Sequence, residues 1–282
     1  MEAPPAMLIA QFTDMHLKPH GTLTFGAVDT AAHLARCVAH VNALTPRPDA
    51  VLVTGDLTND AEPEAYALLR DLLAPLPMPV YLIPGNHDDR AGLRAAFPDH
   101  AYLPDGDFLH YAVENHAVRL IGLDTIVPGE AGGEMCDARI AWLAETLAAA
   151  PERPTVGFMH HPPFPTGIAF MDAMGLDGRD AMAAVVRRHG QVERVLCGHL
   201  HRPIQVRWAG TIAATAPATA HQVDLALSDD APAHWVMEPP AVQLHLWRPE
   251  TGVISHTSYI GDFGDKGSFK DPHTPPLARV GS

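Results

Sequence analysis

The sequence predicts a layered α/β fold in which helices pack over buried β-strands. Up to about residue 200, short apolar runs that are typical of strands alternate with segments whose apolar residues recur every three or four positions. Beyond residue 203 the pattern changes, and β-like runs predominate up to about residue 260. Because the chain has 282 residues and neither an internal repeat nor a long linker, we expect one domain.

Seven short apolar runs are expected to form the strands of the first two-thirds of the chain. They cover residues 7–14, 49–56, 80–86, 108–114, 117–124, 155–161 and 192–199. The later β-like runs cover residues 204–216, 241–247 and 252–260, and a loop is expected over 228–240. The predicted organisation is a core over residues 1–210, a β-rich elaboration of the same domain over 211–262, and an extended tail over 263–282.

Helices are predicted between the strands from apolar stripes with helical spacing. They lie around residues 28–41, 65–72, 140–147 and 179–189. The segment PLPMP breaks the second helix, since proline cannot continue a helix. Asp137 is placed near the N-terminal cap of the third helix, and Gly190 is the expected stop of the fourth.

Composition restricts the classes of partner and the compartment. The formal net charge of −14 argues against a broad surface for nucleic-acid polymers or anionic membranes. No apolar run approaches the length of a membrane span, and the N-terminus does not resemble a secretion signal. The three cysteines are far apart in the sequence, which indicates reduced thiols rather than a disulfide framework. We therefore expect a cytoplasmic protein.

Polar residues gather where five of the predicted strands end. They are Asp14 and His16, Asp56, the run Asn86, His87 and Asp88, the pair His160 and His161, and the pair His199 and His201. Each group alone also fits an ordinary turn residue, helix cap or packed histidine. The carboxyl ends of strands form the ligand-binding edge of an α/β sheet. Polar residues at five strand ends therefore favour one shared site over five unrelated structural roles.

The segment CGHLH, at residues 197–201, carries the strongest single signal. Alternate residues of a strand face the same way, so the spacing predicts that His199 and His201 lie on one side, where they could chelate a metal. Glycine precedes the polar residues at three places: Gly55, Gly85 and Gly198. We expect these glycines to permit close backbone approach or positive φ in a crowded site.

The ordered blocks DMH (14–16), GD (55–56), GNHD (85–88), HH (160–161) and GHLH (198–201) resemble those of the calcineurin-like metallophosphoesterases. The resemblance implies a four-layer α-β-β-α sandwich, with two mixed sheets flanked by helices. It also implies two divalent transition-metal ions, Mn, Fe or Zn, held by seven side chains. One ion would be bound by Asp14, His16, Asp56 and His201, and the other by Asp56, Asn86, His160 and His199.

The same resemblance implies roles for the residues around the ions. His87 would give a proton to the leaving alkoxide. From its adjacency in the sequence alone, Asp88 is expected to orient His87. Asn86 and His87 would lie near the substrate, and His161 would lie either near the substrate or behind the metal ligands. A bridging hydroxide, activated by both ions, would attack a phosphoryl group whose charge the ions neutralise. The segment 160–176 would form a loop over the site, and His221 is a further pocket candidate.

Differences from other branches of the family narrow the expected substrate. The motif GDLTND has no tyrosine after its first aspartate, unlike purple acid phosphatases, and GNHD replaces the GNHE of Ser/Thr protein phosphatases. The remaining resemblance is to bacterial class III cyclic-nucleotide phosphodiesterases and their glycerophosphodiesterase relatives. It implies a hydrolase of small phosphodiesters, with 3′,5′-cyclic nucleotides, glycerophosphodiesters and promiscuous monoester and diester cleavage left open. A homo-oligomer, or a non-catalytic protein-binding scaffold on the same fold, is also left open.

Overall fold

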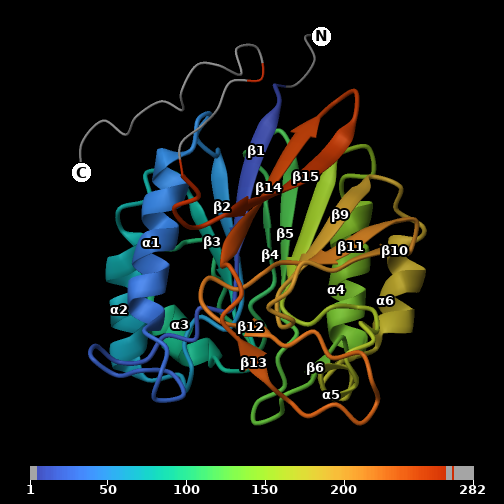
Figure 1. The fold of residues 1–282 in the computed structure, drawn as a ribbon. Helices are drawn as coiled ribbons and strands as arrows, with labels where there is room; N and C mark the ends of the chain where they lie inside the picture. Colours follow the sequence, from blue (N-terminus) through green and yellow to red (C-terminus); the bar gives the residue numbers. More distant parts are fainter. Residues whose placement is uncertain (1–4, 265–268, 270–282) are drawn as a thin grey trace.

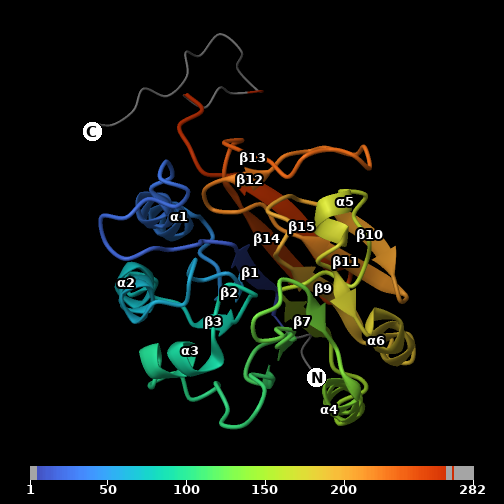
Figure 2. The same cartoon turned by 90° about the horizontal axis from the view of Figure 1, so that it is seen from below.

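Two β-sheets pack face to face, and helices cover the outer face of each (Figure 1). The computed structural model describes residues 5–264 and 269. The helices α1, α2 and α3 lie against one sheet, and α4 and α6 lie against the other (Figures 1 and 2). The predicted four-layer α-β-β-α sandwich of two mixed sheets is therefore confirmed.

The first sheet has five strands in the order β15-β14-β1-β2-β3. Their bounds are Gly252–Tyr259, Ala241–Arg248, Met7–Phe12, Ala50–Thr54 and Val80–Ile83. The strands β1, β2 and β3 are parallel, whereas β14 runs antiparallel to β1 and pairs with β15. Residues from the far end of the chain thus complete the sheet that the N-terminus begins.

The second sheet has six strands in the order β10-β11-β9-β7-β5-β4. Their bounds are Gln205–Trp208, Thr211–Thr215, Val192–Cys197, Thr155–Met159, Arg119–Leu123 and Tyr111–Val113. Four neighbouring strands, β11, β9, β7 and β5, are parallel, and the edge strands β10 and β4 are antiparallel to their neighbours. The predicted run 204–216 is therefore a hairpin of two strands.

The helices are α1 (Thr30–Ala43), α2 (Pro63–Leu73), α3 (Arg90–Ala96), α4 (Asp137–Ala148), α5 (Ala169–Asp172) and α6 (Arg179–Val186). Small pairs form between β6 (Gly133–Glu134) and β8 (Leu176–Asp177), and between β12 (Gln222–Val223) and β13 (Trp235–Val236). The elements α5, β6, β12 and β13 lie at the lower end of the sandwich (Figure 1).

Alternating side chains of the buried strands fill two separate cores. On β2, Ala50 and Leu52 belong to the cluster between the sheets, whereas Val51 and Val53 belong to the cluster beneath α1 and α2. A strand that is covered on both faces needs apolar residues at every position, which explains the continuous run AVLV. Burial on both faces fixes the register of β2, and with it the position of the polar residues that follow.

The differences from the predicted elements are mainly at their ends. The helix α6 ends at Val186 rather than at residue 189, because the next turn tightens into bonds from Arg188 N to Val185 O and from His189 N to Val186 O. The helix α3 was not predicted, since its seven residues bury only Leu93. Residues 211–262 contribute strands to both sheets. The predicted tail lies outside the described residues, apart from 263, 264 and 269.

No helix in the described part of the chain has both the length and the apolar character that a membrane crossing requires.

Candidate metal centre

The seven side chains predicted as metal ligands come together at the carboxyl ends of five strands. They follow β1, β2 and β3 of the first sheet and β7 and β9 of the second. Figure 2 looks onto this edge of the sandwich. Each strand ends two or three residues before the position that the sequence predicted, so the polar residues lie on loops. The shared site that the five strand ends indicated is therefore present as a single cluster.

The first group consists of Asp14, His16, Asp56 and His201, whose donor atoms lie within 4.8 Å of one another. His16 Nε2 lies 3.1 Å from His201 Nε2 and 3.4 Å from Asp56 Oδ2. His201 Nε2 lies 3.5 Å from Asp14 Oδ1. All four side chains are buried. Two carboxylates and two imidazoles that converge in this way fit a first-row transition ion.

The second group shares Asp56 with the first. His160 Nε2 lies 3.4 Å from Asp56 Oδ1 and 3.0 Å from Asn86 Oδ1. The ring of His199 lies 5.1 Å from that of His160. The two oxygens of Asp56 thus face different groups, since Oδ2 faces His16 and Oδ1 faces His160. This arrangement fits a carboxylate that bridges two ions.

Backbone carbonyls fix which nitrogen of three histidines is available to a metal. Nδ1 of His160 lies 2.8 Å from Thr54 O, and Nδ1 of His201 lies 3.0 Å from His221 O. Nε2 of His199 lies 3.1 Å from Met174 O. A carbonyl only accepts hydrogen bonds, so each of these nitrogens carries a proton, and the other ring nitrogen is the one that a metal could use. For His160 that nitrogen is Nε2, which faces Asp56 Oδ1 and Asn86 Oδ1. Metal-binding histidines are commonly held in this way.

Five of the predicted ligands have a left-handed backbone. The φ angles are 54° at Asp14, 45° at His16, 49° at Asp56, 70° at His199 and 49° at His201. Such conformations cost about 1–3 kcal/mol each for residues with a side chain, and they persist only where the surroundings enforce them. Their concentration at one edge of the sandwich marks a functional site rather than a set of ordinary turns.

The left-handed backbone also corrects the prediction for His199 and His201. Strand β9 ends at Cys197, so the two histidines do not alternate along a strand. The Asp14 carboxylate accepts the His199 backbone N–H at 3.1 Å and helps to hold the turn. As a result, His201 faces the first group and His199 faces the second. Both histidines lie at the cluster, but the expected reason, alternation along a strand, was wrong.

Glycine is required where the loops cross. A Cβ atom at Gly85 would overlap the Asp56 carboxylate and the Asp56 backbone nitrogen. At Gly55, where φ is 92°, a Cβ would overlap the His160 ring. A Cβ at Gly198 would overlap Thr13 Oγ1. The expected role of these glycines in close approach is thus confirmed.

The buried members of the cluster shift one another's pKa values. Burial alone would raise the pKa of Asp56, but His160 and His16 hold it well below its usual value. Burial would lower the pKa of His160, yet Asp56 raises it to about 9. Burial keeps the pKa of His16 and His199 well below the usual value, so both are neutral at pH 7. The neutral imidazoles of His16 and His199 and the ionised Asp56 carboxylate are donors of the kind that divalent cations bind.

His87 lies at the mouth of the cluster and is exposed. Its backbone N–H donates to Asp56 Oδ1 at 3.0 Å, and its ring lies edge-on to His16 at 4.6 Å. Nδ1 lies 2.7 Å from Asn59 O, so Nδ1 carries the proton and Nε2 remains free for exchange with a substrate.

The prediction that Asp88 orients His87 is wrong, because Asp88 makes no hydrogen bond to the His87 ring within the described residues. The buried Asp88 carboxylate accepts from Leu57 N, Thr58 N and Gly85 N at 2.9, 3.0 and 2.9 Å. It thereby joins the loop after β2 to the loop after β3. Burial raises the pKa of Asp88 to about 6, and the Asp56 charge adds to the effect.

The position of His161 argues against its predicted contact with the substrate. The ring is fully buried, with Nδ1 2.8 Å from Thr125 Oγ1 and Nε2 3.1 Å from Ala131 O. Both ring nitrogens are therefore occupied. The ring stacks at a tilt against His199 at 4.7 Å and supports that residue from behind.

A cavity of about 340 Å³ opens onto the cluster. Its polar side is formed by His16, Asp56, Asn86, His87, His199 and His201. Its apolar side is formed by Phe25, Phe170, Met171, Met174, Val223 and Trp235. Three of these apolar residues, at 170, 171 and 174, belong to the loop that the sequence placed over the site. Phe25 and Trp235 were not predicted, because a turn residue and a residue of a two-residue strand, 210 positions apart, leave no periodic signal.

His221 lies between the two sides of this cavity. Its ring lies 4.8 Å from His201 and 5.4 Å from His16, and burial lowers its pKa to about 4. Nδ1 of His221 is buried without a hydrogen-bond partner. The sequence indicated this residue as a pocket candidate, and it does line the cavity.

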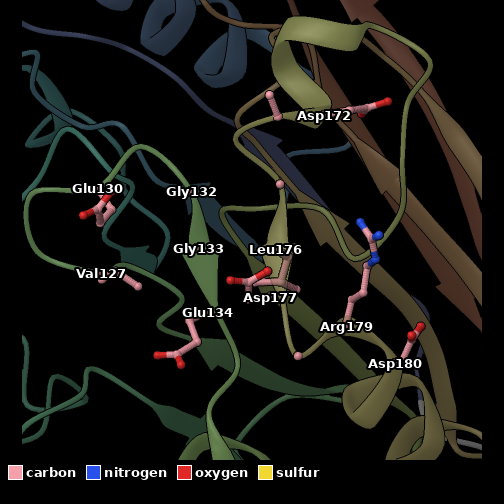
Figure 3. A pocket seen from close by; sticks show the side chains of 13 residues that line it. Val127, Glu130, Gly132, Gly133, Glu134, Asp172, Leu176, Asp177, Arg179 and Asp180 are labelled. Atoms are coloured by element: carbon pink, nitrogen blue, oxygen red, sulfur yellow. The ribbon is translucent and has the colours of Figure 1, made fainter.

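A larger cavity, of about 790 Å³, lies outside the cluster (Figure 3). Its labelled charged residues are Glu130, Glu134, Asp172, Asp177 and Asp180, with Arg179 among them (Figure 3). None of the predicted ligands lines it. A hollow with five carboxylates repels an anionic phosphodiester, so its size does not make it a rival substrate site.

Comparison with known proteins agrees with this geometry. Residues 7–203 match the family model described as calcineurin-like phosphoesterase. The chain belongs to this family. It is 39% identical over 258 residues to a probable glycerophosphodiester phosphodiesterase GpdQ of Arcobacter nitrofigilis, covering 91% of this chain and 94% of the relative. It is 34% identical over 228 residues to a cAMP/cGMP dual specificity phosphodiesterase of Mycobacterium tuberculosis, covering 79% and 71%.

Solved structures share the fold at low sequence identity. A dimetal phosphatase from Danio rerio superposes with a TM-score of 0.64 and 15% identity, covering 90% of this chain and 99% of that one. At this identity the likeness concerns the fold alone.

Proposed function

We propose that the protein is a dinuclear metal-dependent phosphodiesterase that hydrolyses small phosphodiesters. The observation that carries the proposal is the position of Asp56, whose two oxygens face two separate groups of metal donors. The names of the relatives support diesters as substrates, because they include glycerophosphodiester and cyclic-nucleotide phosphodiesterases. Glycerophosphodiesters and 3′,5′-cyclic nucleotides are accordingly the two substrate classes proposed.

The residues present fit two divalent transition ions, with Mn, Fe and Zn as candidates. Asp14, His16, Asp56 and His201 would hold one ion, and Asp56, Asn86, His160 and His199 the other. When bound, such a pair neutralises phosphoryl charge and lowers the pKa of an attacking water. The side chains of the chain itself set the positions: Asp56 keeps the two donor groups together, and the carbonyls on His160, His199 and His201 keep their free nitrogens pointing inward.

His87 is the proposed proton donor to the leaving alkoxide. Because Asn59 O holds the proton on Nδ1, Nε2 is the atom that takes up a second proton and delivers it. The ring lines the cavity beside the donor cluster and is exposed, so it can reach a bound ester oxygen and exchange protons with solvent. Positioned general acids of this kind contribute about 10²–10⁴-fold to rate.

The test separates metal binding from proton transfer. Purified protein is stripped, reloaded with Mn, Fe or Zn and assayed with bis(4-nitrophenyl) phosphate, cAMP, glycerophosphodiesters and nucleotide monoesters. Asp56→Ala should lose the metal pair, measured by elemental analysis, together with activity. His87→Ala should retain the metals and lose rate most on diesters with poor leaving groups. A wild-type protein that binds no metal and cleaves no diester would instead indicate the scaffold alternative.

A further inference from the structure

Two aromatic side chains from opposite ends of the chain stack over the cavity. The rings of Phe25 and Trp235 lie 5.6 Å apart with an angle of 16° between their planes, and both line the cavity that holds the donor cluster. Phe25 is 59% exposed and Trp235 is 41% exposed. We call this pair the aromatic platform. An exposed stacked pair at the mouth of a polar site is typical of a surface that binds a ligand.

The platform is attached to the donor cluster through His221. The His221 ring lies edge-on to Phe25 at 5.2 Å and to Trp235 at 6.1 Å. The carbonyl of His221 accepts from His201 Nδ1 at 3.0 Å. The position of the platform is therefore fixed relative to the proposed metal ligands, so that a ligand can contact both.

The backbone at Phe25 is held in an unfavourable conformation. Its φ is 54°, within a tight turn in which Thr24 and Val28 exchange backbone hydrogen bonds at 2.9 Å. Thr24 Oγ1 donates to His16 O at 2.9 Å, which ties the turn to the segment of a proposed metal ligand. The Phe25 ring contacts Trp235 and His221 but stays largely exposed, and a strained backbone that presents an exposed aromatic ring points to a role in binding.

We propose that the aromatic platform stacks on a planar ring carried by one ester group of the substrate, and that it makes ring-bearing esters bind in preference to glyceryl esters. The proposal rests on the proposed function, since it takes the donor cluster as the site of the phosphoryl group. Aromatic faces favour offset stacking. No lysine or arginine is found among the described residues that line the cavity, so its apolar wall carries no permanent positive charge for an additional phosphate or carboxylate group.

A quaternary ammonium group is the competing ligand for an aromatic face. Phe25 and Trp235 are too close to enclose such a group between them at 5.6 Å. Among the described residues, the carboxylate that lines this cavity is Asp56, which faces His16 and His160. The observations therefore favour an uncharged planar ring.

The experiment compares two ligands of equal phosphate charge, AMP and glycerol 3-phosphate. Each is titrated into the Mn-loaded protein by calorimetry, while phosphate release is monitored. Stacking of a base on an aromatic side chain is worth about 1–3 kcal/mol, or roughly 5- to 150-fold in affinity. Phe25→Ala and Trp235→Ala should each lower the affinity for AMP about tenfold or more, and the affinity for glycerol 3-phosphate by less than about twofold. Phe25→Tyr should behave like the wild type.

Leu227→Ala is the matched control. Leu227 is 64% exposed and lies between β12 and β13, as part of the segment that leads to Trp235, but it does not line the cavity. It should leave both affinities unchanged. The platform is overturned if the wild type shows no preference for AMP, or if both alanine variants keep that preference. Glycerophosphocholine is titrated as a third ligand. The platform is also overturned if the two alanine variants lose affinity for glycerophosphocholine and keep it for AMP, which would indicate the ammonium group.

The outcomes for the platform and for the proposed function are distinct. A wild-type protein that hydrolyses bis(4-nitrophenyl) phosphate but binds AMP and glycerol 3-phosphate equally disproves the platform alone. A protein that prefers AMP through Phe25 and cleaves no diester disproves the proposed function alone.

Discussion

Replacing Asp88 by alanine should destabilise the protein, with no selective effect on proton transfer. Three buried backbone N–H groups, those of Leu57, Thr58 and Gly85, would lose their acceptor. An unpaired buried donor costs about 1–3 kcal/mol, so three of them cost about 3–9 kcal/mol. Burial raises the pKa of Asp88 to about 6, which means that the ionised carboxylate is itself unfavourable. Removing that charge offsets part of the loss, and we expect about 3 kcal/mol.

The assay is urea unfolding of metal-stripped protein at pH 8, followed by circular dichroism. Stripping is necessary because bound metal would add to the stability of both proteins by mass action. Asp107→Ala is the control, since Asp107 is exposed, and it should change the free energy of unfolding by less than about 0.5 kcal/mol. The rate of the metal-loaded enzyme is measured in parallel.

One result would refute this reasoning. If Asp88→Ala unfolds with the wild-type free energy, keeps its metals and loses rate as His87→Ala does, then Asp88 acts on His87. The sequence-based role would then be correct, and the hydrogen bonds to the two loops would be of little energetic value.

Three further changes test other parts of the structure. Gly85→Ala should prevent tight metal binding, measured by elemental analysis, because the Cβ would overlap Asp56; a normally loaded variant would contradict the predicted overlap. Burial lowers the pKa of His110 to about 4, so the neutral form stabilises the fold above pH 6.5 and that stability is lost as pH falls toward 4. His110→Gln should therefore reduce the loss of unfolding free energy between pH 6.5 and pH 4 by up to about 3 kcal/mol. Parallel curves of unfolding free energy against pH for the variant and the wild type would contradict this. Asp29→Ala should cost about 1 kcal/mol in urea unfolding, because Asp29 Oδ1 caps α1 at Ala32 N; an unchanged midpoint would show that the cap contributes nothing.

The sequence predicted the strands and long helices because their signals are local. The run AVLV of β2 is continuous since both of its faces are buried, and the stripe at Leu34, Val38 and Val41 marks the buried face of α1. The antiparallel pairing of β14 with β1 could not be predicted in this way. It joins residues more than two hundred positions apart, and tertiary packing determines which strand pairs with which.

At the site, residue types were more predictable than contacts. The donor residues could be found because they follow strands in a fixed order. The partner of Asp88 could not, because adjacency to His87 says nothing about where a buried carboxylate finds its donors. Likewise, the proton position on His199 depends on Met174 O, a backbone atom without any sequence signature. Phe25 comes from a turn and Trp235 from the two-residue strand β13, and neither segment is long enough to give a periodic signal.

The left-handed ligands and the buried Asp88 are parts of one arrangement. Asp14, Asp56 and His201 have conformations that an isolated loop would avoid, so their loops need external restraint. Asp88 supplies it on one side by holding the loops after β2 and β3 together. Asp14 supplies it on the other by accepting the backbone N–H of His199. The local rules of strand and turn formation therefore fail at the same residues where the chemistry is proposed, because donor atoms from separate strands can converge only if the backbone leaves its preferred conformation.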